Sequence, residues 1–199
     1  GGQGVFPIER PTRSLSAMLA RAGGVSIDPE VAVVTVKRGG STGRIWLRDL
    51  YSNPRYDIAL RPGDVILVEE DQRSFTALGA LGGQTKVPLG SEEINAIEAI
   101  AMVGGLSTTL ADPTGVFVLR NEPQAVATRV LGKSVYGDQR MAYVLDLTRP
   151  NGLFLARDFL IRAGDTVYVT EAPYVQWQKT LGAITGSVAT ADSMASIGE

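Results

Sequence analysis

The chain has 199 residues, of which 44% are hydrophobic, and its 19 basic and 21 acidic residues give a net charge of −2. This composition is typical of a chain that buries a core, and the scattered basic residues argue against nucleic-acid binding, which needs a basic face. Cysteine and histidine are both missing, which excludes disulfides, thiol catalysis and imidazole as a base or metal ligand.

The first predicted helix begins after an N-terminal stretch, GGQGVFPIER, that has none of the regions of a signal peptide and no initiator methionine. We therefore expect the chain to be part of a longer protein. Ser14 is the predicted cap of a helix that continues to Ala22 with apolar residues at helical spacing. Gly23-Gly24 then supplies the left-handed end of this helix.

Residues 31–50, VAVVTVKRGGSTGRIWLRDL, predict two strands around a glycine-rich turn. The turn sequence RGGSTGR lacks the Lys-Ser/Thr ending of a phosphate-binding loop, and no helix follows it directly. We therefore interpret it as a hairpin turn.

The stretch LRPGDVILVEED (residues 60–71) predicts a tight turn followed by a strand. Gly63 suits the positive φ of a type II turn. Asp64 is expected to bond the neighbouring backbone, although a carboxylate there leaves a ligand role open. The acidic run at residues 69–71 ends the strand and is expected to be solvated rather than catalytic.

The same order of elements then recurs. A strand over residues 75–81, a Gly-Gly turn and a strand over 85–89 lead to a second helix, for which Ser91 is the predicted cap and Gly104-Gly105 the end. The stretch IRAGDTVYVTEA (residues 161–172) repeats the turn and strand, with Gly164 and Asp165 in the places of Gly63 and Asp64.

Internal matches show that one unit is used twice. VFPI (5–8) is matched by KVPL (86–89), LARAGGVS (19–26) by IAMVGGLS (100–107), and VTVKR (34–38) by VFVLR (116–120). The second copy carries an insertion around residues 121–140, and the first lacks its opening strand. Aligning the two closing strands leaves only Ile66/Val68 and Val167/Val169 aliphatic in both, so this face is predicted to be core.

The tail after Pro173 has a different pattern. As a helix of about 26 residues it would measure roughly 39 Å, enough to cross a bilayer. One face of the wheel is apolar, and Tyr174 and Trp177 near the start suit a membrane interface. The apolar stripe is Trp177, Leu181, Ile184, Val188 and Ala191, continued by Ala195. The opposite face, small or polar, holds Lys179, Gly182, Gly186 and Ser193.

The residues alone leave three structural alternatives open for this tail: a helix docked on its own domain, a membrane-inserted helix, or disorder. Two glycines and several threonines weaken the helix. Elsewhere we find no nucleophile–base pair, metal-ligand spacing or dinucleotide fingerprint, so we predict no enzyme activity, cofactor or metal.

The stretch FTALGALGGQTKVPLGSEEINAIEAIAMVGGLS resembles the soluble-ligand-binding β-grasp (SLBB) module, and GVFPIERPTRSLSAMLARAGGVS matches it from the hairpin onward. Two such modules followed by an amphipathic helix resemble the C-terminal part of outer-membrane polysaccharide export proteins of the Wza/KpsD type. The resemblance implies an α+β fold with two tandem β-grasp modules, residues 1–72 and 73–171, and a C-terminal helix over 172–199.

The same resemblance implies a homo-oligomeric ring, octameric in the best-known member, located in the outer membrane with most of the chain in the periplasm. The tail helices would form a barrel through the membrane, with the apolar stripe toward lipid and the small-residue face toward a neighbour or the pore. An inner-membrane polysaccharide co-polymerase or ABC exporter would deliver the polysaccharide. The alternatives are a soluble periplasmic glycan-binding or assembly module with a docked tail, and a subunit of an enzyme complex.

Overall fold

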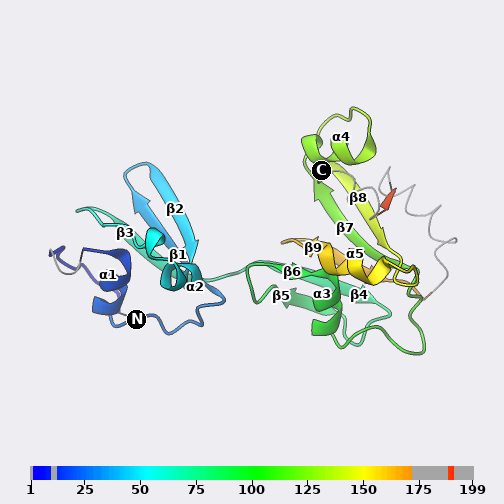
Figure 1. The fold of residues 1–199 in the computed structure, drawn as a ribbon, viewed down its shortest axis with the longest axis horizontal. Coiled ribbons are helices and arrows are strands. Elements are labelled where there is room, and N and C mark those ends of the chain that lie inside the picture. Colours follow the sequence, from blue (N-terminus) through cyan, green and yellow to red (C-terminus); the bar gives the residue numbers. More distant parts are fainter. Residues whose placement is uncertain (1, 10–12, 172–187, 191–199) are drawn as a thin grey trace. The chain divides into compact units, whose positions relative to one another are not determined.

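The computed structural model in Figure 1 describes residues 2–9, 13–171 and 188–190. The chain divides into two compact units. The first comprises Gly1–Gln72 with Gly90–Glu92, and the second comprises Arg73–Leu89 with Glu93–Glu199. Each unit combines helices with a β-sheet, which confirms the predicted α+β class.

The first unit contains an antiparallel sheet of three strands in the order β2-β1-β3. A β-hairpin therefore supplies two of the strands, and the strand after the Gly-Asp turn lies on the other side of β1. Its elements are α1 (Leu15–Arg21), β1 (Ala32–Arg38), β2 (Ser41–Trp46), α2 (Leu47–Ser52), the 3-10 helix η2 (Pro54–Tyr56) and β3 (Val65–Glu70).

Successive side chains of β1 and β3 point to opposite faces of the sheet, and one of these faces lies in the core. Val34 pairs with Val68 and Val36 with Ile66. The apolar residues of α1 and α2 pack on this face, so the core of the first unit is Leu15, Met18, Leu19, Ala32, Val34, Val36, Leu47, Leu50 and Leu60. Ile66 and Val68 pack against it while Val65 is 57% exposed, which confirms the predicted inward face of β3.

The cap predicted for α1 is confirmed. The Ser14 side chain accepts a hydrogen bond from the Ala17 amide at 3.3 Å, which satisfies one of the donors left open at a helix start. Gly23 and Gly24 follow the helix with φ of 91° and 76°, the left-handed conformation that glycine adopts without strain.

The second unit contains a mixed sheet in the order β11-β8-β7-β10-β4-β5 and a two-stranded pair of β6 with β9. β10 runs parallel to β4 and β11 parallel to β8, and the other pairs are antiparallel. Its elements are β4 (Ser74–Gly79), β5 (Thr85–Pro88), β6 (Ile94–Asn95), α3 (Ala96–Met102), β7 (Val116–Glu122), α4 (Gln124–Leu131), β8 (Gln139–Leu145), α5 (Gly152–Asp158), β9 (Leu160–Ile161), β10 (Thr166–Val169) and β11 (Val188–Thr190).

Helices α3 and α5 pack on one face of this sheet and close a core that includes Phe75, Val118, Tyr143 and Phe159. Val167 and Val169 are both 0% exposed, which confirms the predicted core face of the second closing strand. A smaller apolar cluster of Phe117, Ala142 and Val144 lies on the opposite face of the sheet.

The predicted start of the second helix is wrong. Helix α3 begins at Ala96, and Asn95 rather than Ser91 is its cap. The Glu98 amide donates to Asn95 Oδ1 (3.0 Å), and the Asn95 amide donates to Glu98 Oε2 (2.9 Å), which forms a capping box. The reason is long-range: Ile94 and Asn95 pair with β9 as strand β6, so the helix starts after them.

The segment expected to hold an insertion, residues 121–140, contains helix α4 between the ends of β7 and β8. Helix α4 ends at Leu131, and Gly132, which caps it, has φ of 64°. Of the tail, only Val188–Thr190 is described, and it forms strand β11 beside β8. At these three residues the structure therefore differs from the predicted helix, because a neighbouring strand offers them backbone hydrogen bonds.

Candidate functional site

The two Gly-Asp turns, the residues that the sequence singled out in each module, lie directly before the closing strands β3 and β10. Gly63 has φ of 88° and Gly164 has φ of 85°. A side chain at either position would meet no atom within 4 Å, so the backbone conformation rather than space requires glycine there.

In the first unit an arginine side chain binds the aspartate of the Gly-Asp turn. Arg38, at the end of β1, donates from Nε to Asp64 Oδ1 (2.9 Å) and from Nη2 to Asp64 Oδ2 (2.7 Å). The same Nη2 donates to the Ala59 carbonyl (3.0 Å), and the Arg61 amide donates to Asp64 Oδ2 (2.8 Å). This two-pronged geometry fits the planar guanidinium and fastens β1 to the turn before β3.

The second unit repeats this arrangement atom for atom. Arg120, in β7, donates from Nε to Asp165 Oδ1 (2.8 Å) and from Nη2 to Asp165 Oδ2 (2.5 Å). Its Nη2 also donates to the Leu160 carbonyl (2.7 Å), and the Arg162 amide donates to Asp165 Oδ2 (2.7 Å). We call the pairs Arg38–Asp64 and Arg120–Asp165 the two clamps.

The clamps differ in exposure. The Arg38 side chain is 35% exposed, whereas that of Arg120 is 4% exposed, and both aspartate side chains are almost fully covered. The hydrogen bonds from Arg38 lower the pKa of Asp64 to about 2, so this carboxylate stays ionised over the physiological range.

Within the part of the chain that the structure describes, only the second clamp continues into a buried polar cluster. Glu122, which is 0% exposed, accepts from the Tyr143 hydroxyl (2.9 Å) and from Arg162 Nη1 (3.2 Å), and it lies 3.5 Å from Arg120 Nη1. Burial raises the pKa of Tyr143, so its hydroxyl keeps the proton that it donates to Glu122. The guanidinium of Arg120 also lies over the Phe159 ring, 5.1 Å from its centroid.

This arrangement joins strands and turns through hydrogen bonds between charged side chains and backbone groups. Among the described residues, every buried side-chain nitrogen and oxygen has a hydrogen-bond partner. The same part of the chain contains no group of three acidic residues placed to hold a metal ion. The clamps and the cluster are therefore structural elements that set the relative position of strands within each module.

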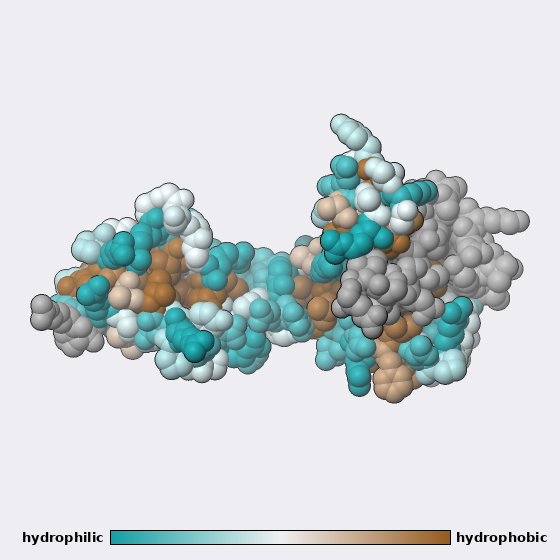
Figure 2. Space-filling view, turned by 45° about the horizontal axis from the view of Figure 1, so that its top comes forward, coloured by the Kyte–Doolittle hydropathy of each residue, from teal (hydrophilic) through white to brown (hydrophobic). Residues whose placement is uncertain are grey.

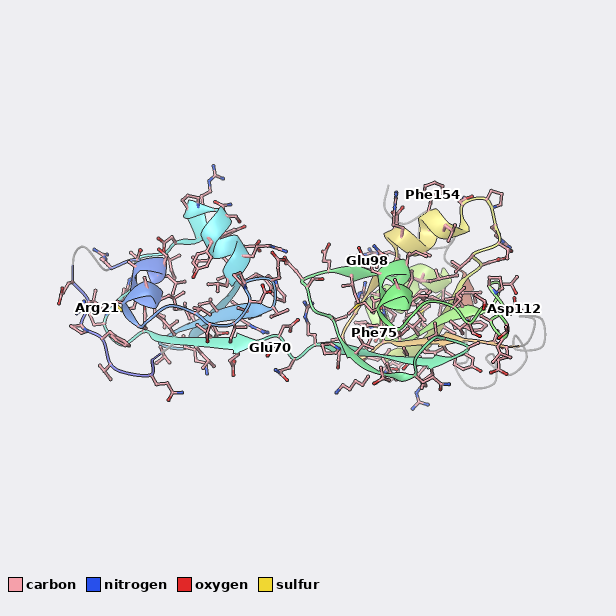
Figure 3. The ribbon with its side chains drawn as sticks, turned by 90° about the horizontal axis from the view of Figure 1, so that it is seen from below. Arg21, Glu70, Phe75, Glu98, Asp112 and Phe154 are labelled. Atoms are coloured by element: carbon pink, nitrogen blue, oxygen red, sulfur yellow. The ribbon has the colours of Figure 1, made fainter. Side chains whose placement is uncertain are left out.

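Exposed apolar side chains offer surfaces for contact with other molecules. Brown, hydrophobic residues reach the surface of both units in Figure 2. On α5, Leu153 is 57% exposed and Phe154 is 59% exposed. Figure 3 shows Phe154 pointing away from its unit, with the Arg157 guanidinium 5.4 Å from the centre of its ring.

The residues predicted for a membrane site are mostly not described by the structure. In the described ranges, which leave out most of the tail, no helix has both the length and the apolar character needed to span a membrane. Val188 is the first residue of β11. The other tail positions lie outside the described residues: Tyr174, Trp177, Lys179, Leu181, Gly182, Ile184, Gly186, Ala191 and Ser193.

Sequence reasoning missed the arginine partners of the two aspartates, together with Glu122 and Tyr143. One signal could have found the arginines. The matched strands VTVKR and VFVLR both end in arginine, and both hairpins are followed by a Gly-Asp turn. The rest of the cluster has no counterpart in the first unit, so comparison of the two copies could not reveal it. Tyr143 lies opposite Val118 in the second unit, whereas Gly43 lies opposite Val36 at the matching place in the first.

Comparison with known proteins gives the following matches. Residues 73–169, which form most of the second unit, match the SLBB domain. The chain is 34% identical over 170 residues to the capsule polysaccharide export protein BexD of Haemophilus influenzae, which covers 82% of this chain and 43% of that protein. It is 31% identical over 186 residues to the Vi polysaccharide export protein VexA/TviF of Salmonella typhi, or 92% of this chain and 50% of that protein.

A more distant relative carries a similar name. The EPS I polysaccharide export outer membrane protein EpsA of Ralstonia solanacearum is 27% identical over 173 residues, which cover 84% of this chain and 42% of that protein. The chain thus spans half or less of the length of these curated relatives, and the matched region extends across both units.

Proposed function

The chain belongs to the SLBB-domain family represented by the capsule and polysaccharide export outer membrane proteins, and we propose that it acts in the export of a capsular or extracellular polysaccharide. The observation that carries this proposal is the similarity over 82% and 92% of the chain to two proteins named for polysaccharide export. These names are those of export proteins and not of enzymes, and the closed polar cluster agrees with a role in holding structure rather than in catalysis.

In the finer form of the proposal, identical subunits assemble into a ring in which the two modules lie in the periplasm. The tail helices cross the outer membrane as a barrel around a pore. An α-helical barrel satisfies its backbone internally, so its helices need apolar side chains only on the lipid side. The sequence of residues 173–199, with Leu181 on an apolar stripe and Ser193 opposite, supports this arrangement. The polysaccharide and an inner-membrane co-polymerase or ABC exporter are the proposed partners.

The test is an export assay in cells that produce the full-length protein. Removal of residues 173–199 is expected to abolish surface polysaccharide, and Leu181→Asp is expected to block membrane insertion because it places a charge on the lipid side. The matched control is Ser193→Asp, which keeps the charge change but lies on the opposite face and is expected to be tolerated. Equal effects of both substitutions would contradict the assigned faces, and export that survives the deletion would contradict a membrane role for the tail.

A second candidate is a soluble periplasmic module that binds glycan or an assembly partner, with its tail docked on the second unit. The pairing of β11 with β8, in which Val188 lies opposite Ala142 and Thr190 opposite Val144, favours this candidate. Docking predicts that Ala189→Pro, which interrupts the strand, speeds amide exchange in β8. A protein that forms detergent-dependent oligomers and shows unchanged exchange in β8 would favour the membrane form instead.

A further inference from the structure

The connection between the hairpin strands differs between the two modules. In the first unit only Gly39-Gly40 lies between β1 and β2. In the second unit the connection between β7 and β8 contains helix α4 and the loop that follows it. Figure 1 shows α4 at the far end of β7 and β8, away from α3 and α5. We call residues 123–140, which are this connection and the first two residues of β8, the arm.

The aliphatic side chains of the arm pack inside its own unit. Ala127 is 0% exposed, and Val130, Leu131 and Val135 pack against the core that α3 and α5 also cover. These side chains support the arm, so they do not form the exposed apolar face with which a helix inserts into a membrane surface.

Two glutamine side chains hold the loop that follows α4. Gln139 Nε2 donates to the carbonyl oxygen of Tyr136 at 2.9 Å and to that of Gly137 at 3.2 Å. The Gly137 amide donates to Gln124 Oε1 (3.2 Å), and φ of Gly137 is 68°. The backbone around Tyr136 is therefore fixed before a ligand binds, which lowers the entropic cost of binding.

The side chain that this loop carries projects into solvent. Tyr136 is 96% exposed, whereas Tyr143 is buried and the Tyr168 ring stacks on Phe117. A tyrosine offers a flat apolar ring and a hydroxyl that both donates and accepts hydrogen bonds, and it loses little side-chain freedom on binding. On a fixed backbone it suits a ligand with an apolar face and polar edges, which is the character of a sugar ring.

The arm is basic although the whole chain is slightly acidic. It contains three basic residues and one acidic residue, which give it a net charge of +2, and all four are exposed: Arg129, Lys133, Arg140 and Asp138. The net charge of the whole chain is −2. A polyanion is therefore attracted to the arm more than to the rest of the surface.

The basic side chains of the arm form no ion pair with any residue that the structure describes. Other arginines of the second unit do: Arg149 lies 3.3 Å from Asp146, and Arg162 lies 3.2 Å from Glu122. A cation without a carboxylate partner can bind an anionic ligand without first breaking an ion pair.

We propose that the arm binds an acidic polysaccharide, with the Tyr136 ring against the apolar face of a sugar and with Lys133 and Arg129 donating to its carboxylates. Charge-assisted hydrogen bonds from ammonium and guanidinium groups favour carboxylates over neutral sugar hydroxyls. The inference rests on the proposed function, because export is what brings a polysaccharide to this protein. It adds the charge of the ligand and the place where it binds.

Titration of the 199-residue chain with carboxylated oligosaccharides tests the charge and the place. The probes are oligogalacturonate and oligosialate, and the neutral control is the methyl ester of the oligogalacturonate, which keeps the sugar rings. Carboxylated probes are expected to shift the amide resonances of the arm, and the ester is expected to bind at least about tenfold more weakly. Binding of neither carboxylated probe at the arm, or equal binding of the ester, would overturn the proposal.

A matched pair of lysine substitutions tests the role of the arm. Lys133→Glu is expected to weaken binding of the carboxylated probe by about tenfold, because it removes a charge-assisted contact and adds repulsion. The control is Lys86→Glu in β5, which makes the same change at another exposed lysine outside the arm and is expected to change affinity by less than about twofold. Equal losses would show that net charge alone attracts the probe, against the proposal.

Tyr136→Ala tests the contact with the sugar ring, and its exposed position makes an effect on folding unexpected. It should weaken binding of the carboxylated oligosaccharide by about fivefold, whereas Tyr136→Phe keeps the ring and most of the affinity. Polyglutamate carries carboxylates without sugar rings, so Tyr136→Ala should leave its affinity unchanged. If polyglutamate binds as tightly as the oligosaccharide and loses as much with Tyr136→Ala, the arm is a site for an acidic polypeptide and the proposal is wrong.

The binding assay and the export assay can fail independently. A protein that cells require for surface polysaccharide, but whose arm binds neither carboxylated probe, would overturn this inference and leave the proposed function intact. A protein that binds the probe at the arm, but whose loss leaves surface polysaccharide unchanged, would overturn the proposed function and leave the binding site intact.

Discussion

At the scale of single residues, the two modules use one device in two environments. Each clamp joins an arginine of a hairpin strand, Arg38 in β1 or Arg120 in β7, to the aspartate of the Gly-Asp turn, with the same set of backbone contacts. Water reaches the Arg38 side chain, whereas the Arg120 side chain is 4% exposed. The energetic consequence of losing the aspartate charge should therefore differ between modules.

Asp165→Asn is expected to destabilise the second unit by about 3–5 kcal/mol, because it leaves the buried Arg120 without its main counter-charge. Asp64→Asn is the matched control in the first unit, and it should cost clearly less, since water solvates Arg38. Urea titrations followed by hydrogen exchange resolve each unit separately. Equal losses in the two units would show that burial of the clamp does not set its contribution.

The pKa of Asp64 predicts a pH dependence for the first unit. The pKa is about 2 in the folded chain and about 3.9 in an unfolded one, so the unfolded state binds the proton more readily. The contribution of this group is therefore complete above about pH 4 and is lost as pH falls toward 2. Urea midpoints of the first unit should fall over this window, and the fall should be smaller in Asp64→Asn. Identical pH profiles would contradict the assigned role of Asp64.

At the scale of elements, the start of α3 shows how a sheet pair decides between two possible caps. Both Ser91 and Asn95 are good capping residues. The pairing of β6 with β9 holds Ile94 and Asn95 in extended conformation, and the reciprocal bonds between Asn95 and Glu98 then begin the helix. The cap and the strand pair thus stabilise the same boundary.

Asn95→Ala is expected to cost about 1 kcal/mol of stability, because the Glu98 amide loses its partner. Asn95→Ser keeps an acceptor at the same place and should cost only a few tenths of a kcal/mol. Chemical denaturation of the second unit measures both. If the two substitutions destabilise equally, the side-chain acceptor is not what stabilises the start of α3.

At the scale of the whole molecule, the chain consists of two units with separate hydrophobic cores. The core of the first unit is built on α1, α2 and three strands, and that of the second on α3, α5 and the larger sheet. Each unit therefore has its own source of stability, as expected of a domain.

We expect the two units to unfold in separable transitions. Leu19→Ala, in the first core, should lower the transition of the first unit by about 2–5 kcal/mol and leave the second unchanged. Ile100→Ala, in the second core, should do the reverse. Hydrogen exchange in increasing urea assigns each transition to its residues. A single transition that both substitutions shift equally would contradict independent units.

Much of the fold could be predicted because its signals are local or repeated. The glycine pairs after α1 and α3, the hairpin around Gly39 and the inward residues of β3 and β10 all follow from short patterns that occur twice. The start of α3 could not be predicted in this way, because it depends on the pairing of Ile94 with β9, which is more than 60 residues away in sequence. The role of the tail stays a prediction, since its site residues except Val188 lie outside the described part of the chain.

The sequence by itself determined the α+β class and the resemblance to polysaccharide export proteins, because both depend on spacing and composition along the chain. Only the tertiary structure decided which side chains come into contact although they lie far apart in the chain. Asp64 and Asp165 are turn residues in the sequence, but strand pairing brings each opposite an arginine, and folding buries one pair far more than the other.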